Sequence, residues 1–180
     1  MIKLKEISFC FFLICFSSAT WSQKLEGATI KPDDPTLPNF NNQNSERINS
    51  IIAFAKTFLG TPYHWGGTTP SGFDCSGFIN YIFGNFGFSL TRTSYNLVEL
   101  GETVKLEDLQ PGDLLFFRGT NPKSTTVGHV AMVTEVTPDA INFIHSSSSG
   151  VKINNFKTSK YYISRYMKAK RLDYQTYKKK

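Results

Sequence analysis

The chain has 180 residues, of which 40% are hydrophobic, 14% aromatic and 19% charged, and its net charge is +6. This composition is too apolar for a disordered protein, and the length is about that of one domain. The three cysteines are an odd number, so a framework in which every cysteine forms an intramolecular disulfide is excluded. Their spacing also gives no structural zinc motif.

The N-terminal segment 1–22 has the three parts of a secretory signal peptide. Two lysines precede the apolar stretch Ile7–Phe16, and small residues follow it. The apolar stretch is about ten residues long, whereas a membrane-spanning helix needs about 20. We therefore expect cleavage after Ala19 or Ser22, export to the periplasm, the cell envelope or the medium, and no membrane span in the mature chain. An uncleaved anchor and lipid attachment at Cys15 are the alternatives.

Residues 23–44 are rich in proline, asparagine and aspartate and are predicted to form a flexible linker. A helix is predicted to follow, with Ser45 as its N-cap and Gly60 as its stop. Its apolar residues recur at helical spacing, namely Ile48, Ile51, Ile52, Ala55, Phe58 and Leu59. The folded domain is expected to cover residues 45–171, before a basic tail at 172–180.

A second helix is predicted to start close to Cys75 and to end at Gly87, with Asp74 as its N-cap. If export removes the N-terminal segment, Cys75 is the single cysteine left. In the first turn of a helix, unpaired backbone N–H groups and the helix dipole stabilise a thiolate, so we expect a lowered thiol pKa. The alternative is that Cys75 is simply a small buried hydrophobic residue.

The second half of the chain has the patterns of short strands separated by turns, over residues 114–117, 129–136, 140–145, 151–153 and 161–169. Helices followed by strands predict an α+β domain with an antiparallel sheet of about five strands. His129 opens one predicted strand and His145 closes the next. Because a tight turn at Pro138-Asp139 joins these strands, the two histidines are expected to be neighbours. A cysteine nucleophile requires a base, and that base requires a group that orients it.

Six motifs in order resemble the NlpC family of bacterial cell-wall cysteine peptidases, which have a reduced papain-like fold. The similarity runs from about residue 46 to 171. The motifs are Gly60-Thr61-Pro62-Tyr63-His64-Trp65-Gly66-Gly67, Asp74-Cys75-Ser76-Gly77-Phe78, Arg92-Thr93-Ser94, Pro111-Gly112-Asp113-Leu114-Leu115-Phe116-Phe117, Gly128-His129-Val130-Ala131 and Phe143-Ile144-His145-Ser146.

The resemblance implies a Cys-His-His triad. Cys75 would be the nucleophile, His129 the general base and acid, and His145 the residue that orients His129. Tyr63 would lie beside the nucleophile and, with the backbone N–H of Cys75, bind the oxyanion. The alternatives without a catalytic role are that His145 is only a solvated residue at a strand end and that Tyr63 is only a core aromatic.

The same resemblance implies a pocket for the N-terminal side of the substrate. Asp74, Ser76 and Ser94 would line it, Trp65 would form a wall, and Asp74 would pair with a free amine of the peptide. The alternative for Trp65 is again a place in the core. His64 falls at a variable position of its motif and is expected at the rim.

The implied substrates are peptidoglycan stem peptides, cut at the bond between γ-D-glutamate and a diamino acid or at the cross-link between stems. The chemistry would be acyl transfer through a thioester, with no metal or organic cofactor. Two other functions remain open at this point. One is a catalytically idle wall-binding module, and the other is an amidase or acyltransferase with the same thiol.

Basic residues are concentrated toward the C-terminus, from Lys152 to Lys180. Such a run either holds the enzyme near an anionic envelope polymer or is a solvated strand and tail. An exported peptidase is not expected to bind nucleic acid, and we expect a monomer.

Overall fold

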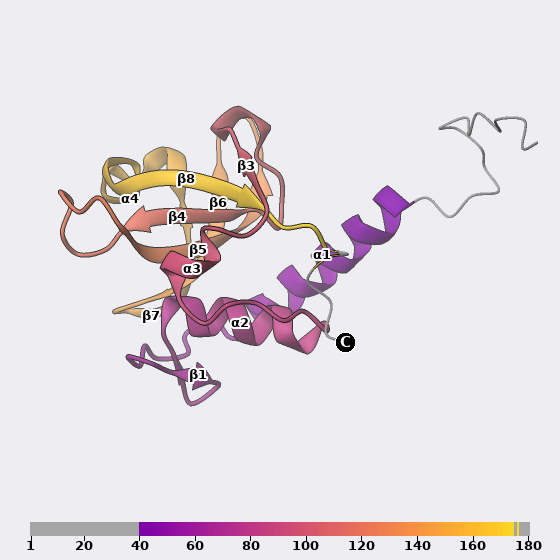
Figure 1. The fold of residues 1–180 in the computed structure, drawn as a ribbon, viewed down its shortest axis with the longest axis horizontal. Helices are drawn as coiled ribbons and strands as arrows, with labels where there is room; N and C mark the ends of the chain where they lie inside the picture. Colours follow the sequence, from indigo (N-terminus) through magenta and orange to yellow (C-terminus); the bar gives the residue numbers. More distant parts are fainter. Residues whose placement is uncertain (1–39, 175, 177–180) are drawn as a thin grey trace, which may run out of the picture. The chain divides into compact units, whose positions relative to one another are not determined.

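The computed structural model describes residues 40–174 and 176. The predicted signal peptide, most of the predicted linker and most of the basic tail lie outside these residues. None of the helices in the described part is both long and apolar enough to cross a membrane. The helical elements are α1 (Phe40–Lys56), α2 (Cys75–Asn85), α3 (Ser94–Leu97), η1 (Leu106–Asp108), η2 (Phe156–Thr158) and α4 (Lys160–Arg165) (Figure 1).

The strands form two antiparallel sheets within the described residues. A two-stranded sheet pairs β1 (Thr68–Thr69) with β2 (Gly72–Phe73). The main sheet has six strands in the order β3-β8-β4-β5-β6-β7. These strands are β3 (Glu102–Val104), β4 (Leu114–Arg118), β5 (Val127–Val136), β6 (Ile141–Ser147), β7 (Gly150–Asn155) and β8 (Tyr166–Arg171). The predicted α+β class with an antiparallel sheet is thus confirmed, with one strand more than expected.

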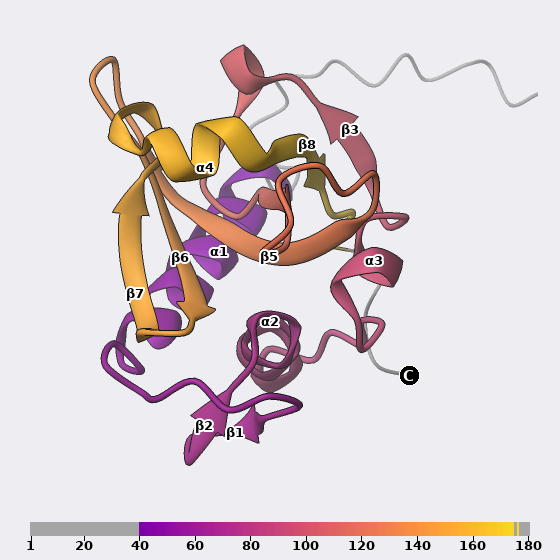
Figure 2. The same cartoon turned by 90° about the vertical axis from the view of Figure 1, so that its left-hand side faces the viewer.

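Both faces of the main sheet are covered, because successive side chains of a strand point to opposite faces. On β4, Leu114 and Phe116 join the core that also contains α1 and α2. The alternate residues Leu115 and Phe117 join a second core, to which α4 contributes Tyr162. Figure 2 shows α2 on one side of the sheet and α4 on the other. This explains why the four residues 114–117 are all buried.

The first helix begins earlier than predicted. α1 starts at Phe40, so Ser45 lies inside the helix instead of capping it, and the helix ends at Lys56. The polar residues 41–45 carry no apolar periodicity, and this is why the hydrophobic pattern did not detect the first turns. The buried residues Ile48, Ile51 and Ile52 confirm which face of the helix packs on the core.

The predicted strand over residues 161–169 was wrong in its first half. Residues Lys160–Arg165 form the helix α4, and only Tyr166–Arg171 form a strand, β8. Ser159 caps α4 by accepting a hydrogen bond from the backbone N–H of Tyr162. Tyrosine-rich sequence favours a strand on local propensity, but burial of Tyr162 and the serine cap stabilise a helical turn here.

Candidate active site

The N-terminus of α2 positions the candidate nucleophile, Cys75, as the first residue of the helix. Asp74 is the N-cap, and its carboxylate accepts a hydrogen bond of 2.6 Å from the backbone N–H of Gly77. The helix packs on the core through Phe78, Ile79 and other buried apolar side chains. The predicted helix and its cap are confirmed, and the packed helix fixes the position of Cys75.

The sulfur of Cys75 lies where α2 meets the sheet. Backbone N–H groups of Val130, Ser76 and Cys75 itself interact with the sulfur and lower its pKa, as expected at a helix N-terminus. Burial has the larger effect and raises the pKa, and the negative charge of Asp74 adds to it. The prediction of a lowered thiol pKa was therefore wrong: the pKa of Cys75 in the free protein is raised.

His129 and His145 form the predicted pair. The Nε2 atom of His129 lies 3.0 Å from Nδ1 of His145, in a hydrogen bond between β5 and β6. The His145 side chain is 0% exposed, which excludes the alternative of a solvated residue at a strand end. Burial lowers the pKa of both histidines, and a positive charge on Lys152 lowers both pKa values further. Both rings are therefore neutral at pH 7.

The far side of His145 has two partners that the sequence did not identify. The Nε2 atom of His145 lies 2.9 Å from Oδ1 of Asn154 on β7 and 3.3 Å from the hydroxyl of Tyr162 on α4. The β6–β7 register pairs His145 with Lys152, so Asn154 is two residues along on the same face. Predicting β6 and β7 as a hairpin with the correct turn would have placed Asn154 beside His145. The contact of Tyr162 could not be predicted in this way, because its segment was predicted to be a strand.

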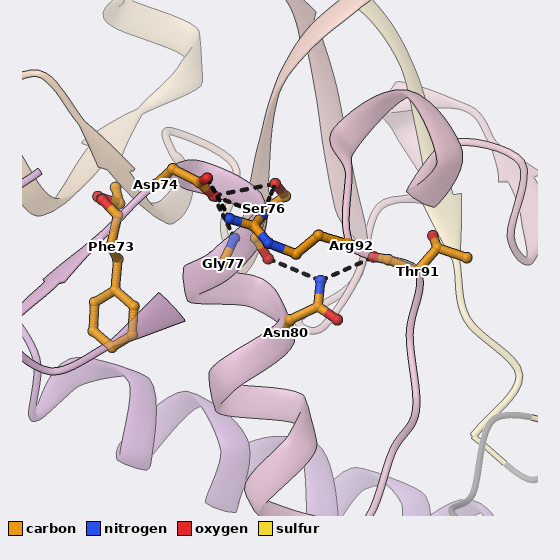
Figure 3. Close-up of polar contacts among 8 residues, drawn as sticks. Phe73, Asp74, Ser76, Gly77, Asn80, Thr91 and Arg92 are labelled. Carbon is orange, nitrogen blue, oxygen red and sulfur yellow. Dashed lines mark hydrogen bonds and ion pairs between the residues drawn. The ribbon is translucent and has the colours of Figure 1, made fainter. Parts of the chain in front are cut away.

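Beside the nucleophile, Asp74 forms an ion pair with Arg92 (Figure 3). The guanidinium donates to both carboxylate oxygens, at 3.1 and 2.6 Å, and to the Ser76 hydroxyl at 2.9 Å. Partial burial alone would raise the pKa of Asp74, but the bonds from Arg92 and from the backbone of Gly77 lower it below its usual value. Asp74 is thus not the free acceptor that the sequence analysis expected. Arg92 stood in a motif but had no assigned role.

The two aromatic residues of the Tyr63 motif lie in different surroundings. Tyr63 is partly buried and forms an isolated bridge with Phe73, one residue before the N-cap of α2. Its pKa is raised by this burial and by the charges of Cys75 and Asp74, so its hydroxyl remains protonated. Trp65 is 86% exposed, which excludes a place in the core.

Besides Ser76, two more serines are buried in the described part of the chain. Ser94, predicted in the substrate pocket, is the first residue of α3 and is buried. Ser146, which follows His145 on β6, donates a hydrogen bond of 2.8 Å to the carbonyl of Phe73. This bond ties the strand of the histidine pair to the segment that leads into α2. Burial of Ser146 was not expected from the polar run that begins there.

The structure brings Cys75 against strand β5, but the rings of His129 and His145 pack with Phe117 and Tyr162 of the second core, away from the core that includes Cys75. Val130, whose N–H interacts with the Cys75 sulfur, directly follows His129, so the sulfur lies beside the strand position of the predicted base. Within residues 40–174, the His129 ring forms its hydrogen bond through Nε2, to His145. No hydrogen bond in this range joins the ring to the sulfur of Cys75. In the same part of the chain, no group of His, Cys, Asp and Glu side chains is arranged to hold a metal ion.

Comparison with known proteins adds independent evidence. Residues 60–171 match the model of the NlpC/P60 family. The chain is 39% identical over 124 residues to a gamma-DL-glutamyl hydrolase of Bacillus subtilis, covering 68% of this chain and 29% of that protein. It is 36% identical over 138 residues to a gamma-D-glutamyl-L-lysine dipeptidyl-peptidase of Bacillus cereus, covering 72% of this chain and 40% of that protein. The chain thus spans less than half the length of these relatives.

A solved structure has the same fold. An NlpC/P60 family protein from Bacillus cereus superimposes with a TM-score of 0.60 and 38% sequence identity, over 69% of this chain and 39% of that one. Its fold is the papain-like arrangement expected from the motifs. The family match covers the helix of Cys75 and the strands of both histidines, so the chain belongs to the NlpC/P60 family.

Proposed function

We propose that this chain is an exported cysteine endopeptidase that hydrolyses amide bonds in peptidoglycan stem peptides. The observation that carries the proposal is the placement of Cys75 at the capped N-terminus of α2, beside strand β5, which holds His129 of the His129–His145 pair. The name of the Bacillus cereus relative, gamma-D-glutamyl-L-lysine dipeptidyl-peptidase, supports the bond between γ-D-glutamate and a diamino acid as the site of cleavage.

In the proposed reaction, His129 takes the proton of the Cys75 thiol while the sulfur forms a bond with the amide carbonyl carbon. The carbon–nitrogen bond then breaks, and the leaving amine receives that proton from His129. Water resolves the thioester: His129 takes a proton from the water, its oxygen bonds to the carbonyl carbon, and the thiolate leaves and is reprotonated. Because the rings pack with Phe117 and Tyr162 on the sheet face away from α2, the reaction requires the His129 ring to approach the sulfur when substrate binds.

The tetrahedral intermediate carries a negative oxygen that needs fixed donors. The hydroxyl of Tyr63 and the backbone N–H of Cys75 are proposed for this role. Tyr63 suits it because its raised pKa keeps the hydroxyl protonated. His145 is proposed to hold the His129 ring through their hydrogen bond of 3.0 Å.

Substrate binding is proposed to involve Asp74, Ser76, Ser94 and Trp65. An amine of the substrate would meet a carboxylate that Arg92 already neutralises, so it would share Asp74 with the guanidinium or displace it. The 86% exposed indole of Trp65 is available as a wall of the pocket. Localisation outside the cytoplasm and cleavage of the segment 1–22 are part of the same proposal.

Mass spectrometry of peptidoglycan fragments tests the proposal. The purified protein is incubated with peptidoglycan whose stems carry either lysine or diaminopimelate, and the released peptides are sequenced. The expected products end in γ-D-glutamate. Release of a whole stem peptide from the sugar would instead indicate an amidase. Binding without any new fragment from either wall type would favour the idle module and overturn the proposal.

A further inference from the structure

The most informative group outside the predicted triad is Asn154, which contacts the side of His145 that faces away from His129. Oδ1 of Asn154 lies 2.9 Å from Nε2 of His145, while Nδ1 of the same ring lies 3.0 Å from Nε2 of His129. The His145 ring is 0% exposed, so no bulk water substitutes for either partner. The protonation of the buried ring is therefore determined by its protein neighbours.

The chemistry of the amide oxygen fixes the direction of these bonds. An amide oxygen only accepts hydrogen bonds, so Nε2 of His145 must carry the proton that it donates to Asn154. In a neutral imidazole the other nitrogen then carries a lone pair. Nδ1 of His145 is thus an acceptor, and its partner, Nε2 of His129, must be the donor. The tautomer of each ring follows from that of its neighbour.

This order leaves the second nitrogen of His129, Nδ1, as an unprotonated base. We infer that Asn154 is a positioning residue for the catalytic base: by accepting the Nε2 proton of His145 it keeps Nδ1 of His129 free to take the proton of Cys75. The inference rests on the proposed function for its catalytic meaning. Its structural content, the tautomer of two histidines, stands without it.

The hydroxyl of Tyr162 is the other group at Nε2 of His145, at 3.3 Å. A tyrosine hydroxyl can donate or accept, so on its own it selects neither tautomer. If it donated to Nε2, the proton of His145 would move to Nδ1, and Nδ1 of His129 would carry a proton as well. The shorter contact to Asn154 opposes this arrangement, which makes Asn154 the selecting partner.

The charged and titratable groups around His145 come from three elements. Lys152 on β7 lies opposite His145 in the strand register, Tyr162 approaches from α4, and His129 itself lies on β5. The Lys152 charge disfavours a second positive charge on either ring. All of these groups are compatible with a neutral pair at pH 7, in which the tautomer decides whether a base exists.

Nitrogen NMR of the full chain labelled with ¹⁵N-histidine tests the inference directly, because the chemical shift distinguishes a protonated from an unprotonated ring nitrogen. At pH 7 the wild type is expected to show Nε2–H on His145 and on His129. Asn154→Leu removes the acceptor, so we expect loss of this tautomer preference. Tyr162→Phe is expected to keep it. A wild-type spectrum with Nδ1–H on His145, or an unchanged spectrum in Asn154→Leu, would overturn the inference.

Kinetics add a second readout on stem peptides. Asn154→Leu is expected to lower kcat about 10- to 100-fold with little change in KM, because Nδ1 of His129 is then no longer kept unprotonated while the pocket is intact. Asn154→Asp keeps an acceptor of the same size and is expected to keep the tautomer. Its negative charge favours protonated His145, so activity should be retained at pH 8 and fall earlier as the pH is lowered. Wild-type kcat at every pH in both variants would contradict the catalytic role.

Asn142→Leu provides the matched control. Asn142 is on β6, three residues before His145 and on the opposite face of the sheet, and it donates to Glu135. The control is expected to have wild-type spectra and wild-type kcat. If the wild type cuts no stem peptide, the proposed function fails, but the NMR experiment still decides the tautomer. If Asn154→Leu does not fold, the isosteric Asn154→Asp carries the test.

Discussion

At the scale of single residues, two effects act in opposite directions on Cys75. The backbone N–H groups at the start of α2 favour the thiolate, whereas burial favours the neutral thiol and raises the pKa. Sequence reveals the first effect because a helix start is visible in the pattern of Asp74 and the apolar residues after it. It does not reveal the second, which depends on strand β5 lying against the helix. The free protein therefore holds a thiol that needs its base.

The pH dependence of alkylation tests this state of Cys75. Iodoacetamide reacts with the thiolate, and a raised pKa means that the thiolate fraction still increases above the ordinary value of 9.0. We expect the alkylation rate of the free protein to keep rising beyond pH 9, measured by intact mass. Free glutathione serves as the reference thiol. A rate that levels off below pH 8 would show a preformed thiolate and contradict the account.

At the scale of elements, the start of α2 depends on close backbone packing. A side chain at Gly77 would come within 2.0 Å of the carbonyl oxygen of Gly67, in the loop that follows Tyr63 and Trp65. The sequence shows that glycine stands at position 77. It does not show why glycine is needed there, because the contact joins two segments ten residues apart. The same holds for the two partners of His145. Asn154 reaches it from the β6–β7 hairpin, and Tyr162 reaches it from α4, whose residues the sequence pattern predicted as part of a strand.

Two alanine substitutions in the same helix separate backbone packing from helix propensity. Gly77→Ala is expected to push the loop of Tyr63 away from Cys75, lowering both kcat and the free energy of unfolding, by about 1–3 kcal/mol for the latter. Gly84→Ala has no atom within 4 Å of its new side chain. It is expected to leave kcat unchanged and to stabilise the protein by about 0.5–1 kcal/mol. Urea unfolding and stem-peptide cleavage check both.

Equal effects of the two substitutions would contradict this account of the loop. In that case helix propensity alone would explain the stability change, and the distance between Gly67 and Gly77 would have no role in placing Tyr63.

At the scale of the whole molecule, the candidate site residues come from both faces of the main sheet. α2 and its core cover one face of the sheet, while the rings of His129 and His145 pack near Phe117 and Tyr162 on the other. The fold class, the Cys75 helix and the two histidine strands were all predictable, since each rests on local periodicity and turns. The pairing of β8 with β3 and β4 was not, because it joins distant segments.

Burial of two neutral histidines makes the stability of the whole domain depend on pH. Their pKa values are lowered in the folded state, so the unfolded chain binds more protons below about pH 6.5, and stability falls as the pH is lowered from there. Each histidine contributes up to about 1.4 kcal/mol per pH unit. The pKa of Asp74 is lowered, so the stability that its charge contributes is lost only as the pH falls below about 3.8, outside the range in which the histidines act.

Urea unfolding between pH 7 and 5 measures this dependence. The wild type is expected to lose stability as the pH falls, and His145→Asn, which removes one titrating ring, is expected to show a shallower slope. Equal slopes in the two proteins would mean that the His145 pKa is not lowered by burial.

The central claim is that the sulfur of Cys75 performs the reaction, and the most direct test is the rate at which Cys75→Ala cleaves a defined stem peptide, followed by mass spectrometry. Cys75 is only partly exposed and its replacement by alanine removes a single atom, so the variant is expected to keep the wild-type unfolding curve. The account predicts a loss of at least about 1000-fold in kcat with that curve unchanged. Cleavage at the wild-type rate by the folded variant would contradict it.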